Sequence, residues 1–155
     1  MDATRTLKVG DIAPDFVLKD HHNREFRLAD QKGQRVLLSF HPLAWTHVCS
    51  QQMKDLEANA AVLAGLNAIA VGLSVDSVPS KHAWAKSLGV KQTRLLSDFW
   101  PHGQVAHALG LFREEEGFSE RANVLIDEHG RVAFIKIYPV PERPALDEIL
   151  AVLKG

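Results

Sequence analysis

One cysteine stands in a short segment rich in groups that donate and accept hydrogen bonds. Residues 39–53 read SFHPLAWTHVCSQQM, and Cys49 is the single cysteine among the 155 residues of the chain. A thiolate is a strong nucleophile, whereas one cysteine alone excludes an internal disulfide and any CxxC redox or zinc motif. The segment therefore predicts chemistry carried by a single activated thiol.

The pattern around Cys49 places it where a strand passes into a helix. Residues 35–40 form an apolar run typical of a buried strand, and after Pro42 apolar residues recur at helical spacing from Met53 to Leu63. We expect Cys49 in or near the first helical turn, where free backbone N–H groups and the helix dipole favour a thiolate. Because intrinsic nucleophilicity falls with thiol acidity, fast chemistry also needs donors aimed at the leaving atom.

The strands and helices that must position this thiol are predicted to alternate along the chain. Residues 16–19 and 26–28 flank the polar turn DHHNRE, which predicts a β-hairpin. Further strands are expected at residues 68–75, 95–96, 123–126 and 132–137, and further helices at 81–88, 105–112 and 146–153. The last two strands read as a hairpin turning at His129-Gly130. This alternation predicts an α/β fold with a mixed central sheet flanked by helices.

Length, charge and apolar content limit the number of domains, the kinds of partner and the location of the protein. A chain of 155 residues is one domain by length, so residues 1–155 are expected to form a single domain. A net charge of −1 argues against a nucleic-acid or electrostatic membrane partner. The N-terminal residues lack the apolar stretch of a secretory signal, and no window resembles a spanning helix. We expect a cytoplasmic protein.

The spacing Pro42-x-x-x-Thr46-x-x-Cys49 is similar to the active-site motif of peroxiredoxins, the AhpC/TSA-type thiol peroxidases. Three further segments resemble the same family: VGDIAPDFVLKD at residues 9–20, GLSVDS at 72–77 and SDFWPHG at 97–103. The last of these resembles the one-cysteine alkyl hydroperoxide reductase E group. The resemblance implies a thioredoxin-like fold with an N-terminal β-hairpin and no cofactor.

The resemblance also implies roles for the residues around the thiol. Cys49 would be the nucleophile that attacks the peroxide and becomes a sulfenic acid. Thr46 would hold the peroxide, and Arg121 would stabilise the thiolate and the peroxide oxygens. The backbone N–H groups of Val48 and Cys49 would complete the donor set, and Pro42 would shape the pocket.

Three more residues are expected to contribute to substrate binding: His41, Trp45 and Gln52. Many relatives carry Phe in place of Trp45 and Glu in place of Gln52. A neutral Gln52 is therefore expected to change the hydrogen bonding to the arginine. His47, beside the nucleophile, is expected to make the site sensitive to pH near neutrality.

The resemblance implies a thiol-dependent peroxidase that reduces hydrogen peroxide, organic hydroperoxides or peroxynitrite. Because no second cysteine exists, an external thiol must reduce oxidised Cys49, and mycothiol, glutathione or a redoxin are the candidates. Relatives dimerise through loops around the active site, so we expect a homodimer.

Other interpretations of the same residues stay open at this point. The fold suits a thioredoxin-like thiol transferase or a non-catalytic holdase or regulatory module, and a free cysteine alone is more often buried and inert. Thr46 alone would cap a helix, as would Asp76 and Ser77. His41, His47 and Cys49 lack an evident fourth zinc ligand, so no metal is predicted.

Overall fold

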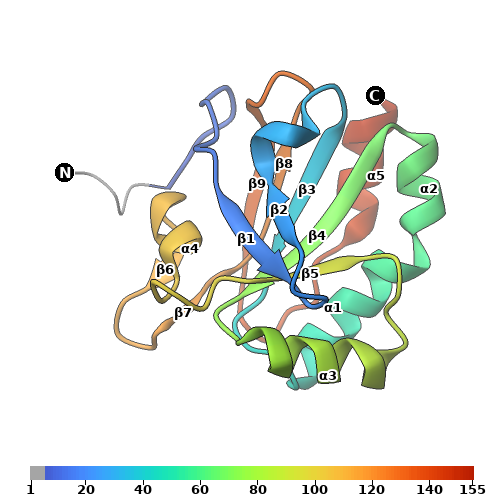
Figure 1. The fold of residues 1–155 in the computed structure, drawn as a ribbon. Coiled ribbons are helices and arrows are strands. Elements are labelled where there is room, and N and C mark those ends of the chain that lie inside the picture. The colour runs from blue at the N-terminus through green and yellow to red at the C-terminus, as the bar shows by residue number, and fades with distance from the viewer. Residues whose placement is uncertain (1–5) are drawn as a thin grey trace.

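The structure, a computed structural model, describes residues 6–155 and centres on a mixed sheet of seven strands (Figure 1). The strands are β1 (Val17–Asp20), β2 (Glu25–Arg27), β3 (Arg35–Phe40), β4 (Ala68–Ser74), β5 (Arg94–Ser97), β8 (Arg121–Ile126) and β9 (Val132–Tyr138). They lie in the order β2-β1-β5-β4-β3-β8-β9, with β3, β4 and β5 parallel and the other neighbours antiparallel. The predicted N-terminal hairpin and mixed sheet are confirmed.

Helices cover both faces of this sheet (Figure 1). They are α1 (His47–Ala58), α2 (Ala60–Gly65), α3 (Val78–Leu88), α4 (Gln104–Ala108) and α5 (Leu146–Lys154), with a 3-10 turn η1 at Leu28–Gln31. The side chains of successive β3 residues point to opposite faces of the sheet. Leu37 packs with α1, α3 and α5, whereas Val36 and Leu38 pack with α4 and the hairpin. No helix among residues 6–155 is both long and apolar enough to cross a membrane.

Two predicted helices differ from the structure. The apolar stripe from Met53 to Leu63 is divided between α1 and α2, which meet at Asn59. Phe112, predicted in a helix, instead begins strand β6 (Phe112–Arg113), which pairs with β7 (Phe118–Ser119). Gly110 adopts a positive φ of 73° just after α4, and this left-handed residue turns the chain out of the helix.

The sheet register determines what lies beside the start of α1. Strand β3 ends at Phe40, and the chain then crosses residues 41–46 before α1 begins. In the antiparallel β3–β8 pair, Phe40 lies opposite Ala122, so Arg121 stands level with the end of β3. A residue 72 positions away in the sequence from Cys49 is thereby brought to the N-terminal turn of α1.

Candidate active site

Cys49 occupies the first turn of α1, as predicted, and its side chain is fully buried. Thr46 is the N-cap residue in extended backbone, and its carbonyl accepts the Ser50 N–H at 2.9 Å. The Thr46 hydroxyl does not cap the helix; it donates to the Leu43 carbonyl at 2.9 Å. The first-turn N–H groups of α1 therefore receive no acceptor from the side chain of their N-cap residue.

Arg121 reaches the cysteine sulfur from strand β8. Its Nη1 donates to Cys49 Sγ at 3.1 Å and to Gln52 Oε1 at 2.8 Å, and its Nε donates to the Val140 carbonyl at 2.7 Å. The arginine is only 2% exposed, so this contact is made away from water. The permanent positive charge of the guanidinium thus lies against the sulfur, at the positive end of the α1 dipole, and such surroundings are typical of reactive cysteines.

Gln52 holds the arginine in place. The Gln52 amide nitrogen donates to Ser39 Oγ at 2.7 Å and to the Phe40 carbonyl at 3.1 Å, which leaves its oxygen to face Arg121. Ser39 Oγ in turn donates to Asn123 Oδ1 at 2.8 Å.

Ser39 and Asn123 were missed from the sequence, although a signal was present. Each is a buried polar residue within the apolar part of its strand, and buried polar side chains need partners. The register places Ser39 directly opposite Asn123 in the β3–β8 pair. The residue pattern alone does not give strand order or register, so it could not show that Ser39 and Asn123 lie next to each other.

The loop before α1 carries the other predicted site residues. Pro42 is buried, Val48 is half-buried, and Thr46 is exposed beside them. Trp45 has a positive φ of 73° and is 54% exposed, and its indole N–H donates to Ser80 Oγ at 3.0 Å. The Trp45 side chain therefore contacts α3 rather than joining the cluster of Cys49, Gln52 and Arg121.

Asp76 has a different task from the one predicted. It was expected to cap α3, but its Oδ2 accepts the Ala44 N–H at 2.8 Å and the Ser74 hydroxyl at 2.6 Å, which fastens the loop before α1. Ser77 is the residue that caps α3, and its hydroxyl accepts the Ser80 N–H at 3.4 Å.

His41 faces away from solvent and is fully buried. Its Nε2 lies 3.0 Å from Lys81 Nζ, and its Nδ1 lies 3.4 Å from the Ser39 carbonyl oxygen. Burial, with the nearby charge of Lys81, holds the pKa of His41 well below its ordinary value of 6.5, so the ring is neutral. His41 thus contacts the buried Lys81, a residue that the sequence pattern placed only on a helix.

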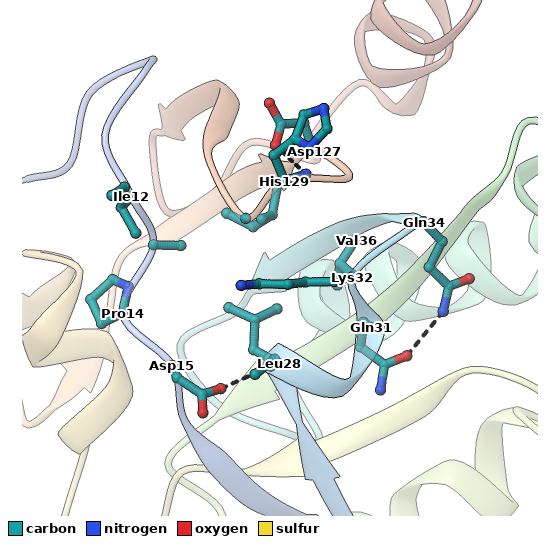
Figure 2. Close-up of a pocket in the computed structure, with 14 residues that line it drawn as sticks. Ile12, Pro14, Asp15, Leu28, Gln31, Lys32, Gln34, Val36, Asp127 and His129 are labelled. Atoms are coloured by element: carbon teal, nitrogen blue, oxygen red, sulfur yellow. Dashed lines mark hydrogen bonds between the residues drawn. The ribbon is translucent and has the colours of Figure 1, made fainter.

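Two features lie outside the Cys49 site. A cavity of about 320 Å³ is lined by residues between Ile12 and Gly130 and includes no residue of the Cys49 cluster. Figure 2 shows Lys32 extending into it beside Leu28. The cavity lies toward the N-terminal end of β3, whereas Cys49 follows the C-terminal end. His21, in the polar turn DHHNRE between β1 and β2, is buried, and its Nδ1 accepts the Leu95 N–H at 3.1 Å.

Comparisons with a family model and with individual proteins identify the same family. The chain matches the AhpC/TSA family over residues 9–135. It is 36% identical over 132 residues to alkyl hydroperoxide reductase E of Mycobacterium tuberculosis (strain ATCC 25618 / H37Rv), covering 84% of this chain and 86% of that protein. It is 31% identical over 157 residues to peroxiredoxin-1 of Gekko japonicus, covering 95% and 78%.

Solved structures share the fold. The reduced 2-Cys peroxiredoxin of Plasmodium vivax superposes with a TM-score of 0.88 at 28% identity, covering 96% of this chain and 81% of that one. Peroxidoxin BcpB of Mycobacterium tuberculosis gives a TM-score of 0.84 at 28% identity, covering 96% and 97%.

A thioredoxin-like sheet that presents a buried thiol to an arginine at a helix N-terminus defines a thiol-dependent peroxidase of the peroxiredoxin class. The chain belongs to the AhpC/TSA family, and its single cysteine fits the one-cysteine type.

Proposed function

We propose that Cys49 is the nucleophile with which this peroxidase reduces hydrogen peroxide, organic hydroperoxides or peroxynitrite. The observation that carries the proposal is the 3.1 Å contact from Arg121 Nη1 to Cys49 Sγ in the first turn of α1. A buried inert thiol has no need of a guanidinium on its sulfur, because burying a charge beside a neutral group is costly.

The reaction transfers one oxygen to sulfur. The Cys49 thiolate attacks the terminal peroxide oxygen, so an S–O bond forms, the O–O bond breaks, and Cys49 becomes a sulfenic acid. The leaving alkoxide or hydroxide takes up one proton to give an alcohol or water, and from peroxynitrite the leaving group is nitrite. Arg121, the Thr46 hydroxyl and the N–H groups of Val48 and Cys49 would stabilise the charge on the oxygens. Pro42 would shield the sulfenic acid from a second peroxide.

Access to the sulfur needs local movement. Cys49 is fully buried in the chain, so a peroxide reaches it only when the loop before α1 or the first turn of that helix shifts. Trp45 lies exposed on this loop and is positioned to contact an incoming substrate. His41 and Gln52, by contrast, are buried, and we propose that they shape substrate binding through Lys81 and Arg121.

An external thiol would complete the cycle. The sulfenic acid condenses with one thiol to a mixed disulfide and water, and a second thiol releases reduced Cys49. Mycothiol, which the sequence resemblance to the alkyl hydroperoxide reductase E group implies, would supply this chemistry, as would glutathione or a redoxin. A catalyst that depends on a reduced thiol suits the cytoplasm.

A homodimer is supported by exposed apolar side chains near the site. Leu43 and Trp45 follow β3, and Phe99 and Trp100 follow β5, and all four are exposed. Because β3, β4 and β5 are parallel, these loops leave the same end of the sheet. We propose that a second copy of the chain covers them.

The first test is the rate at which one equivalent of hydrogen peroxide adds one oxygen to Cys49, followed by quenched intact-mass spectrometry. We expect the folded chain to react at least ~1,000-fold faster than the denatured chain, because only the fold supplies the donors. Cys49→Ser should abolish peroxide consumption.

Two outcomes would overturn the proposal in different directions. Equal rates for folded and denatured chain would favour the holdase or regulatory interpretation, particularly if Cys49→Ser retains holdase activity. Slow peroxide reaction with rapid exchange against a small disulfide would favour a thiol transferase.

A further inference from the structure

Lys81 is a lysine with no exposed surface, and it lies near the helical turn that carries the nucleophile. It stands on α3, where Trp84, three residues later, donates its indole N–H to Ser50 Oγ at 3.2 Å. Ser50 directly follows Cys49 in α1. The Lys81 ammonium lies 5.7 Å from the centre of the Trp84 ring. The face of α3 that holds Lys81 thus packs against the first turn of α1.

Two hydrogen bonds hold the Lys81 amine. Nζ donates to Ser74 Oγ at 2.7 Å and lies 3.0 Å from His41 Nε2. Because an ammonium has no lone pair, His41 accepts through Nε2 and carries its proton on Nδ1, toward the Ser39 carbonyl. The lysine therefore fixes both the orientation and the tautomer of the His41 ring.

The same amine is connected to the loop before α1. Ser74 accepts from Lys81 and donates to Asp76 at 2.6 Å, and Asp76 accepts the Ala44 N–H at 2.8 Å. Lys81 is thus connected to the segment 41–46 at two positions. It bonds His41 directly, and it reaches Ala44 through Ser74 and Asp76. Loss of the amine would loosen this loop at both places.

Charges from several elements act on Lys81. Burial lowers the pKa of Lys81 from 10.5 to about 7, against the opposing effects of Asp76, Cys49 and Asp98. His41 is neutral, and the positive charge of Arg121 acts on it from β8. An interaction between two charges acts on both of them, so this effect connects Lys81 to Cys49.

We propose that Lys81 is a positioning residue that supplies a second buried positive charge to the Cys49 site, beside that of Arg121. Its hydrogen bonds fix His41 and the loop before α1, while its charge favours the thiolate without touching it. The inference rests on the proposed role of Cys49 as the nucleophile. Because burial lowers the pKa of Lys81 to about 7, the contribution of Lys81 fades as the pH rises above neutrality.

The test compares Lys81→Met, which removes the charge at similar length, with Lys86→Met, an exposed lysine of the same helix. At pH 6.5 we expect Lys81→Met to react with hydrogen peroxide about tenfold more slowly than the wild type and to show less thiolate absorbance near 240 nm. At pH 8.5 the difference in rate should shrink to about twofold or less. Lys86→Met should match the wild type at both pH values.

Each other result has a distinct meaning. Wild-type rates in Lys81→Met at pH 6.5 would overturn the inference and leave the peroxidase intact. An equal loss of rate at both pH values with unchanged thiolate absorbance would show a packing role only, which also overturns it. Peroxide consumption by Cys49→Ser would instead overturn the proposed function.

A second measurement keeps the inference testable if Lys81→Met does not fold. The carbon next to the Lys81 amine can be followed by NMR against pH in lysine-labelled wild type and Cys49→Ser. Serine cannot supply the negative charge, so the Lys81 midpoint should fall to lower pH in Cys49→Ser. Identical midpoints would show that the two groups do not interact, and the inference would fail.

Discussion

Arg121 divides its hydrogen bonds among Cys49, Gln52 and the Val140 carbonyl. The contact with Gln52 has a second effect, because Gln52 is itself held by Ser39 and the Phe40 carbonyl. The guanidinium is therefore fixed from several directions before a peroxide arrives. Such preorganisation is what makes donors effective in a transition state.

Arg121→Met removes this donor while keeping an apolar stem of similar length. We expect the rate of Cys49 oxidation by hydrogen peroxide to fall by about 100-fold or more, the usual effect of losing one charge-stabilising donor. Stopped-flow fluorescence would measure the rate, with circular dichroism to verify folding. Arg113→Met, which removes a partly exposed arginine paired with Glu116, should leave the rate unchanged. A normal rate in Arg121→Met would remove the arginine from the mechanism.

Gln52→Leu tests the buried residue that holds Arg121. Leucine leaves the Ser39 hydroxyl and one arginine donor without the amide partner, so the free energy of unfolding should fall by about 1–3 kcal/mol. Urea denaturation would measure this loss, and Gln92→Leu, at an exposed glutamine, should cost little. A neutral outcome for Gln52→Leu would mean that water or a rearranged Arg121 replaces the amide.

Among the elements, strand β4 lies directly beneath the helix that carries the thiol. Gly72 lies in β4, opposite Ser39 of β3, and the space above it is filled by Met53 of α1, Leu95 of β5 and His41. A side chain at Gly72 would overlap the Met53 sulfur and lie 3.2 Å from His41 Cε1. The glycine allows α1 and His41 to lie directly on the sheet.

Gly72→Ala should therefore displace α1 or His41, and we expect a loss of about 1–3 kcal/mol in unfolding free energy together with slower peroxide reaction. Gly65→Ala is the matched control, because a Cβ added at Gly65 would meet nothing within 4 Å and this glycine has no positive φ. Thermal and urea unfolding would compare the two variants. If both behave alike, the close approach of β4 and α1 is not what fixes the site.

At the scale of the whole molecule, the exposed apolar side chains after β3 and β5 predict self-association. Trp100, which is 80% exposed, is the most exposed of them. Trp100→Glu should shift a dimer toward the 17.2 kDa monomer in sedimentation velocity, because a buried charge opposes association. Val62→Glu, at an exposed apolar residue of α2, should leave the assembly unchanged. A wild-type monomer at micromolar concentration would exclude the homodimer.

The pH dependence of stability is a second property of the whole molecule. Since burial lowers the pKa of Lys81 to about 7 from 10.5, the folded chain binds fewer protons than the unfolded chain between these values. Stability from this group is therefore present above pH 10.5 and is lost as the pH falls toward 7, at up to about 1.4 kcal/mol per pH unit. The stability of Lys81→Met minus that of the wild type should thus decrease as the pH rises from 7 to 10. A difference that stays constant over this range would show that Lys81 titrates normally.

Much of the fold and part of the site could be predicted from residue patterns. The hairpin of β1 and β2, strand β3 and the C-cap at Gly89 follow from local alternation, apolar runs and turn residues, all of which act over a few positions. Phe112 was misplaced because its spacing continued a helical stripe, while Gly110 had already turned the chain. The placement of Cys49 in the first turn of α1 is likewise local.

The sequence by itself singled out Cys49 as the candidate nucleophile and determined its place between a strand and a helix and the α/β class. Tertiary structure alone decided which side chains surround the thiol. Arg121 reaches Cys49 across 72 positions because β3 and β8 pair in one register, and the same register joins Ser39 to Asn123. Lys81 is buried beside His41 because the packing of α3 on the sheet decides which face of that helix is buried. Periodicity is local, whereas strand order, register and helix packing are set by burial over the whole sheet.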